Sequence, residues 1–151
     1  MEEMNDRNAA RKAWMSLLAK SDTSTLTQVW GALGIAPDFS YLRAPEIGGV
    51  MVRGRAGAVG AAFNLGEMTV TRCSVKLASG VVGHAYVQGR DKEQARIAAL
   101  VDALMQTKDA AVVQATVIDP LAEIRRSSQA SRAAKAAATK VDFFTMVRGE
   151  D

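Results

Sequence analysis

The segment 88–92 (Gln-Gly-Arg-Asp-Lys) carries the residues best suited to bind an anion. Arg90 and Lys92 supply positive charge beside Gly89, and a helical pattern begins just after Asp91. Free backbone amides at a helix start attract anions, and a glycine allows a ligand close to the backbone. Asp91 competes with such a ligand because its carboxylate can cap the same amides. Arg90 is therefore a candidate phosphate contact, with an intersubunit or structural ion pair as the alternative.

Further arginines occur in strand patterns, where they could face an anion. Arg53 and Arg55 share one face of a strand that ends at the glycine-containing turn 56–60, and Arg72 lies in the next long strand pattern. Charged residues are also common on the solvated outer face of a sheet, so that interpretation stays open. The turn lacks the Gly-Lys-Ser/Thr ending of a P-loop and predicts a hairpin connection. Arg55 and Arg72 join Arg90 as candidate contacts to substrate or another anion.

The chain has one histidine, His84, and one cysteine, Cys73. No carboxylate motif at ligand spacing accompanies them, so the sequence predicts no metal site. A single cysteine excludes an internal disulfide, and its place in a strand pattern predicts a small buried hydrophobe. No nucleophile-elbow sequence supports a Ser-His-Asp site. The catalytic residues are therefore unknown from sequence.

The spacing of apolar residues predicts one α+β domain over all 151 residues. Helical spacing indicates an N-terminal helical hairpin, with a first helix that stops near Lys20 and a second that opens at Asp22 and ends at Gly34. Alternation of period two then predicts a mostly antiparallel sheet of four or five strands. Its strand patterns cover 40–43, 50–55, 68–77 and 81–88, with a short segment at 63–67.

C-terminal helices follow the sheet. Asp91 is expected to cap the first, with Gln94 closing a capping box. A helix near Asp109 comes next, and Asp119–Pro120 predicts a cap and first-turn proline that reopen a helix toward Thr139. Five cations and one anion occupy 120–140, among many alanines. This arm is either a solvated helix or one packed closely on another subunit.

The tail 141–151 contains two of the four phenylalanines. An exposed strand of this composition is an aggregation hazard, so we expect it to add to a sheet or insert into a partner. Residues 120–151 thus form a helical arm and docking tail within the single domain. The expected partner-interface residues are Phe143, Phe144, Met146, Val147 and Arg148.

The formal net charge of +3 weakly favours acidic or phosphorylated partners. No signal-peptide core opens the chain, and no run approaches the ~18 apolar residues of a membrane span. These features lead us to expect a cytoplasmic protein that does not bind a membrane.

Five segments of the chain form a recognisable ordered set: 43–48, 63–72, 83–92, 103–106 and 141–149. Together they resemble the PhnG family, the G subunits of the bacterial carbon–phosphorus lyase system. The resemblance covers about 14–149, and the ending Val-Asp-Phe-Phe-Thr-Met-Val-Arg-Gly is its most specific part. The family positions matched are Arg43, Glu46, Arg55, Arg72, Gly89, Arg90 and Asp91.

The resemblance implies a subunit of a cytoplasmic complex in phosphonate catabolism, with H, I and J partners and two copies of each subunit. With the L protein, the first step displaces adenine from ATP by a phosphonate and gives a ribose 1-phosphonate 5-triphosphate. The resemblance places the iron–sulfur cluster and S-adenosylmethionine on the J subunit, so this chain alone is expected to bind no cofactor. Whether it is itself an enzyme is left open, and a mainly scaffolding role in a transferase complex is expected.

Two other functional classes remain open. A self-sufficient nucleotide-binding enzyme would turn over ATP and phosphonate by itself. A nucleic-acid-binding module would use the basic 125–140 segment, and its affinity would fall steeply with salt. Few aromatic residues accompany those cations, which disfavours nucleic acid as a partner.

Overall fold

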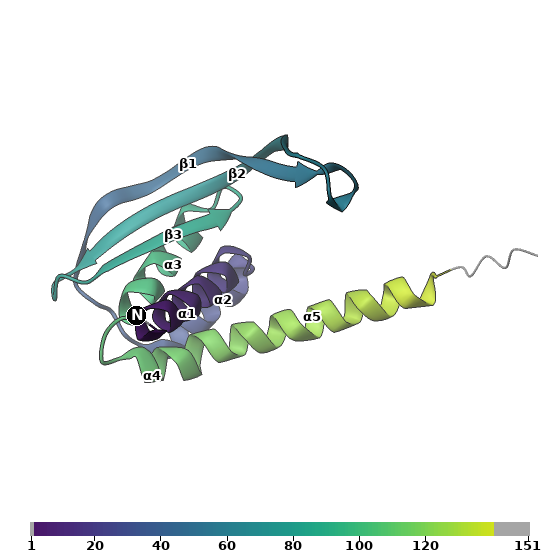
Figure 1. Ribbon diagram of the computed structural model, residues 1–151. Coiled ribbons are helices and arrows are strands. Elements are labelled where there is room, and N and C mark those ends of the chain that lie inside the picture. The colour runs from purple at the N-terminus through teal and green to yellow at the C-terminus, as the bar shows by residue number, and fades with distance from the viewer. Residues whose placement is uncertain (1, 141–151) are drawn as a thin grey trace, which may run out of the picture.

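A computed structural model describes residues 2–140 and shows an α+β fold, as the sequence predicts (Figure 1). Two helices precede a three-stranded antiparallel sheet, and further helices follow it. The elements are α1 (Glu2–Ala19), α2 (Thr23–Leu33), β1 (Phe39–Arg55), the 3-10 turn η1 (Ala56–Ala58), β2 (Ala62–Leu77), β3 (Val82–Gln88), α3 (Lys92–Leu104), α4 (Ala110–Val113), the π-helical turn η2 (Gln114–Ile118) and α5 (Asp119–Ala138).

The predicted N-terminal helical hairpin is confirmed. The carboxylate of Asp22 accepts hydrogen bonds from the amides of Ser24 and Thr25, which starts α2. Gly34 ends that helix with a φ of 67°, a left-handed conformation that glycine adopts without strain. Local capping chemistry therefore determines both ends of the second helix.

The sheet has the order β1-β2-β3, so the expected four or five strands were one or two too many. The patterns at 40–43 and 50–55 belong to one 17-residue strand, β1, that continues through Pro45 with register shifts on either side of Arg43. A proline is tolerated there because β1 is an edge strand and needs no ladder bond on its outer side. Similarly, the segment 63–67 is the first part of β2.

The core lies where α3 packs against the sheet, and ten of the thirteen residues of α3 are buried. The inner face of β3 consists of Gly83, Ala85 and Val87, which are all buried. A Cβ atom on Gly83 would lie 2.0 Å from the carbonyl oxygen of Ala99. Glycine is thus required for this close helix–sheet contact. Cys73 is buried at 1% exposure, as expected.

The predicted cap at Asp119 is wrong, because α4, η2 and α5 follow one another without a break. Asp119 has helical dihedral angles (φ −63°, ψ −45°) and accepts a hydrogen bond from the side chain of Gln114 at 2.6 Å. Pro120 would clash inside a regular α-helix. The wider π turn directly before it accommodates the ring without ending the helix.

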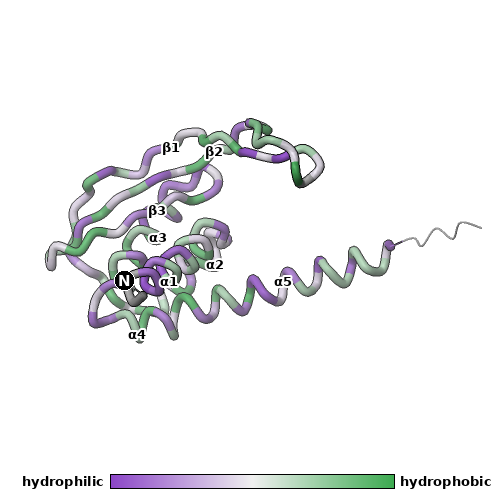
Figure 2. The backbone as a smooth tube through the Cα atoms, viewed as in Figure 1, coloured by the Kyte–Doolittle hydropathy of each residue, from purple (hydrophilic) through white to green (hydrophobic). Residues whose placement is uncertain are grey.

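Two parts of the chain project from this core (Figure 1). We call them the hairpin arm, residues 48–69, and the helical arm, residues 126–140. β3 pairs only with 70–76 of β2, so the hairpin arm has no third strand beside it. Every residue of the helical arm is exposed. Figure 2 shows hydrophobic stretches that continue into the hairpin arm.

Among the described residues, no helix has the length and hydropathy needed to cross a membrane. The expected interface residues Phe143, Phe144, Met146, Val147 and Arg148 lie outside the described residues.

Candidate functional site

At the corner after β3, the structure places Arg90 on the surface beside a helix start that is already capped. The carboxylate of Asp91 accepts hydrogen bonds from the amides of Glu93 (2.9 Å) and Gln94 (3.0 Å). Gly89 turns the chain with a φ of 93°, and its carbonyl accepts from Thr71 Oγ1 at 2.8 Å. Arg90 makes no hydrogen bond or ion pair within residues 2–140. Its guanidinium is available to an anion or to another subunit, whereas the helix amides are occupied.

The capping box predicted for Gln94 does not form. Its side chain is buried and turns away from Asp91 toward the connection between α1 and α2. Gln94 Nε2 donates to the carbonyl of Ser21 at 2.7 Å, and its Oε1 accepts from Thr23 Oγ1 at 3.3 Å. The buried glutamine therefore ties α3 to the helical hairpin.

Arg72 belongs to a charged cluster on the outer face of the sheet. Glu46 Oε2 accepts from Arg43 Nη1 at 2.8 Å and from Arg72 Nε at 3.2 Å. The hydrogen bond from Arg72, followed by that from Arg43, lowers the pKa of Glu46. All three residues are among the matched family positions, and the structure brings them together. The guanidinium of Arg72 is thus already paired with a carboxylate of the same chain.

A hydroxyl–imidazole pair lies beside this cluster. Ser74 Oγ and His84 Nδ1 are 2.9 Å apart on the outer face, and Arg72 pairs with Tyr86 one step further along the strands. Sequence reasoning missed this pair, although the alternation in β2 and β3 places both residues on the outer face. Within residues 2–140 no carboxylate bonds to the imidazole, so the triad arrangement is incomplete.

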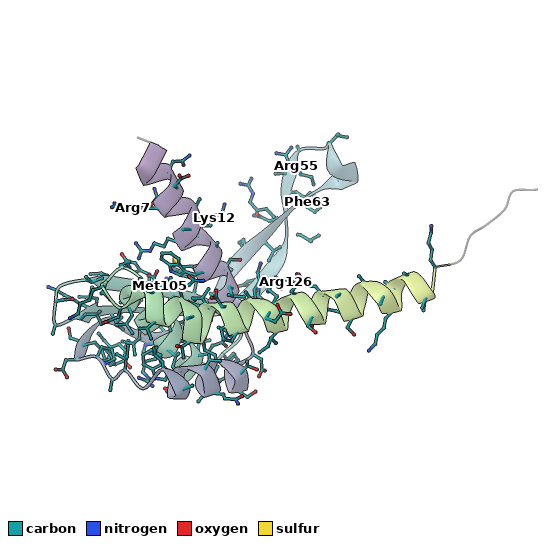
Figure 3. The ribbon with its side chains drawn as sticks, turned by 90° about the horizontal axis from the view of Figure 1, so that it is seen from below. Arg7, Lys12, Arg55, Phe63, Met105 and Arg126 are labelled. Carbon is teal, nitrogen blue, oxygen red and sulfur yellow. The ribbon has the colours of Figure 1, made fainter. Side chains whose placement is uncertain are left out.

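Arg55 lies far from the other two candidate arginines, at the end of β1 near the tip of the hairpin arm (Figure 3). Its Nη1 donates to the carbonyl of Gly60 at 3.4 Å. In the strand register Arg55 is opposite Ala62 and Glu46 is opposite Arg72. Ten residues of β2 separate these positions, or about 30 Å at the rise of an extended strand. The three arginines do not converge on one pocket.

The most densely bonded side chain in the described structure is Asp102, which sequence reasoning missed. This carboxylate has no solvent exposure and joins α1, α3 and β3. It accepts from Arg11 Nε (3.1 Å) and Nη2 (2.7 Å), from Trp14 Nε1 (2.9 Å) and from the amide of His84 (2.8 Å). An acidic residue among the apolar positions of a helix was the available signal. The four hydrogen bonds that Asp102 accepts show that its role is structural.

A groove of about 430 Å³ runs between α1 and β3. Its apolar lining includes Met15, Leu18, Val87 and Ala98, and Arg11 and Lys12 lie along α1 at its margin. Figure 3 shows Lys12 on the exposed length of α1. With a mostly apolar lining and a sheet edge on one side, the groove suits a peptide segment better than a nucleotide.

The family described as phosphonate metabolism protein PhnG matches residues 9–149. The chain belongs to the PhnG family. The predicted resemblance is therefore confirmed over nearly the whole sequence. The match includes both projecting arms and all but the last two residues of the tail.

A curated PhnG relative from Rhizobium meliloti (strain 1021) is 43% identical over 143 residues. The alignment covers 95% of this chain and 92% of the relative. That protein is alpha-D-ribose 1-methylphosphonate 5-triphosphate synthase subunit PhnG. The relative is thus a subunit of a synthase and matches this PhnG chain along almost its whole length.

Proposed function

We propose that this chain is a subunit of a ribose 1-methylphosphonate 5-triphosphate synthase in phosphonate catabolism. The observation that carries the proposal is the 43% identity over 95% of the chain to a synthase subunit of that name. In this role the chain supports the displacement of adenine from ATP by a phosphonate. ATP is then a substrate of the assembled complex.

The chain acts mainly as a scaffold in this proposal. The hairpin arm exposes large apolar side chains that a monomer leaves in water, among them Met51 at 56% and Leu65 at 67% exposure. Exposed apolar residues gathered on one projection are typical of a surface covered by another protein. The partners proposed are the H, I and J subunits, with L for the first step and two copies of each core subunit.

A contribution to anion binding belongs to the same proposal. Arg90 has a guanidinium unpaired within the described residues, and Arg72 and Arg55 offer charge at separate places. The proposal places the iron–sulfur cluster and S-adenosylmethionine on the J subunit, as the family resemblance implies. The one cysteine of this chain is buried and cannot supply a set of cluster ligands, which agrees with that assignment.

The proposal is tested by following adenine release from ATP and methylphosphonate. The expected result is release by a mixture of the partner subunits with this chain, loss of release when this chain is omitted, and no release by this chain alone. Turnover by the isolated chain would instead show a self-sufficient enzyme. Release that is unchanged without this chain would contradict the proposed role.

A further inference from the structure

The strand β3 forms one edge of the sheet. Its unpaired side, away from β2, borders the groove along α1. Two hydrogen bonds identify the backbone groups that point outward. The amide of His84 donates to Asp102 Oδ2 at 2.8 Å, and the carbonyl of Val82 accepts from Gln106 Nε2 at 3.0 Å. Neither group is used by β2. Side chains of α3 and of the turn after it therefore already bind the outward backbone groups in the first half of β3, the carbonyl of Val82 and the amide of His84.

The second half of the edge is open. In an antiparallel strand the backbone groups of alternate residues point the same way, so the carbonyl of His84 and both backbone groups of Tyr86 also face outward. The structure gives these three groups no hydrogen bond within residues 2–140. Unpaired groups of this kind are a template for an added strand. They border the groove, in which Met15 and Ala19 are partly exposed while Leu18 and Val87 are almost fully buried.

We propose that the open half of β3 binds residues 141–147 of a second copy of this chain as an added strand. The segment reads Val-Asp-Phe-Phe-Thr-Met-Val, without proline or glycine and rich in the residues that favour strands. Its seven residues equal the length of β3. An added strand gains main-chain hydrogen bonds from the edge and places alternate side chains in the groove.

The length and direction of α5 favour a second copy over the same chain. Leu121 is the last buried residue of α5, and the helix continues to Ala138. This length carries the chain about 26 Å away at the rise of an α-helix. Residues 141–147 span about 24 Å when fully extended. Returning to its own core would use the whole segment and leave none to lie along β3.

Charge supports the same occupant. Residues 141–151 contain three acidic residues, Asp142, Glu150 and Asp151, and one basic residue, Arg148. Of these, Asp142 lies in the proposed strand, and the margin of the groove carries Lys12, whereas the charge of Arg11 is already paired with Asp102. Because each copy has one groove and one tail, exchange between two copies closes a symmetric dimer. This inference deepens the scaffold role proposed above, but its test needs only this chain.

The test uses Tyr86→Pro and the matched control Tyr86→Thr in the full-length protein. Proline removes the outward N–H, which β2 does not use, and such a position on an edge strand tolerates it. Threonine shortens the side chain but keeps the N–H. Sedimentation at increasing concentration is expected to show a dimer for the parent and Tyr86→Thr. The dimer dissociation constant should rise at least tenfold in Tyr86→Pro. A monomeric parent, or an unchanged dimer in Tyr86→Pro, would overturn the proposal.

A cross-linking measurement keeps the test valid if Tyr86→Pro fails to fold. Gln88→Cys is placed in one tagged copy, and Phe144→Cys, Thr145→Cys or Met146→Cys in a second copy of different size. Burial raises the pKa of Cys73 to about 11, so the native thiol competes little. At least one pair should form a mixed disulfide. Ser79→Cys at the β2–β3 turn is the control, and cross-linking there equal to that at Gln88 would overturn the proposal.

Dimer loss in Tyr86→Pro is distinguishable from failure of the synthase role. A monomeric parent that still supports adenine release with the partner subunits would reject the second copy and leave the proposed function standing. In that case one of those subunits, and not a second copy, would occupy the open edge.

Discussion

Asp102 is the single residue on which the joint between the helical hairpin and the sheet edge depends. Asp102→Asn keeps the size of the side chain but removes the charge that accepts from Arg11 and turns one acceptor into a donor. Breaking a buried ion pair on one side costs about 3 kcal/mol. We expect urea unfolding to show a loss of that order, whereas the control Asp109→Asn, at a residue without a side-chain cap bond, should change stability by less than about 0.5 kcal/mol. Equal effects of the two changes would contradict this role.

The charged cluster around Glu46 predicts a pH dependence. Hydrogen bonds from Arg72 and Arg43 lower the pKa of Glu46 below the usual 4.5. A carboxyl with a lowered folded-state pKa stabilises the fold above its unfolded pKa, and that contribution is lost as the pH falls through the folded value. Glu46→Gln should therefore be less stable than the parent at neutral pH, and the difference should shrink below about pH 4. Urea midpoints measured at both pH values check this, and a difference independent of pH would contradict it.

Replacing Arg90 distinguishes the two roles considered for this residue, an intersubunit ion pair and a substrate contact. Arg90→Ala that abolishes assembly indicates an intersubunit ion pair, whereas intact assembly with weaker nucleotide binding indicates a substrate contact. Lys92→Ala at the same corner is the matched control for nonspecific loss of charge. We expect one of the two losses in Arg90→Ala alone, measured by co-purification and by ATP titration of the complex. Parent-like behaviour in both measurements would reject both roles.

At the scale of elements, the hairpin arm is expected to serve assembly and not folding. Leu65→Asn removes an apolar side chain that is 67% exposed, so the free energy of unfolding should change by less than about 0.5 kcal/mol. Binding to partner subunits should weaken at least tenfold. Val112→Asn, at an exposed valine on α4, is the control and should leave binding unchanged. Loss of stability without loss of binding would place Leu65 in the fold instead.

Local chemistry made most elements predictable, and long-range partners account for the misses. Asp22, Gly34 and Asp91 act as caps through neighbouring residues, so the sequence reveals them directly. The break expected between the strand patterns 40–43 and 50–55 and the cap expected at Asp119 were wrong, because neighbours in space decide what Pro45 and Asp119 do. Pro45 lies in an edge strand, where no hydrogen bond is needed on the outer side, and the π turn before Asp119 makes room for the ring of Pro120. Likewise, the side chain of Gln94 donates to the carbonyl of Ser21, which lies 73 residues away in the sequence.

The candidate site was predictable only in part for the same reason. Arg72 and Arg90 lie in the elements expected, but pairing in the sheet decides that Arg72 meets Glu46 and that Arg55 lies apart. The Ser74–His84 pair and the four bonds of Asp102 needed the register and the helix packing. Family resemblance, carried by ordered segments, was independent of these contacts and was confirmed.

At the scale of the whole molecule, a small core within residues 2–140 supports two arms that bury few of their residues. The hairpin arm exposes apolar side chains, and all the charged residues of the helical arm are cations. Such a shape gives little area for a catalytic pocket and much for partners. The arrangement therefore fits a subunit that organises a complex better than an enzyme acting alone.

Co-purification of tagged chain with the H, I and J subunits tests this account most directly. The full-length protein is compared with a chain truncated after Lys140, which keeps every element from α1 to α5. The account predicts that the full-length chain recovers the complex and the truncated chain does not, while both have the same thermal unfolding midpoint. A full-length chain that recovers none of the three subunits would contradict the central claim.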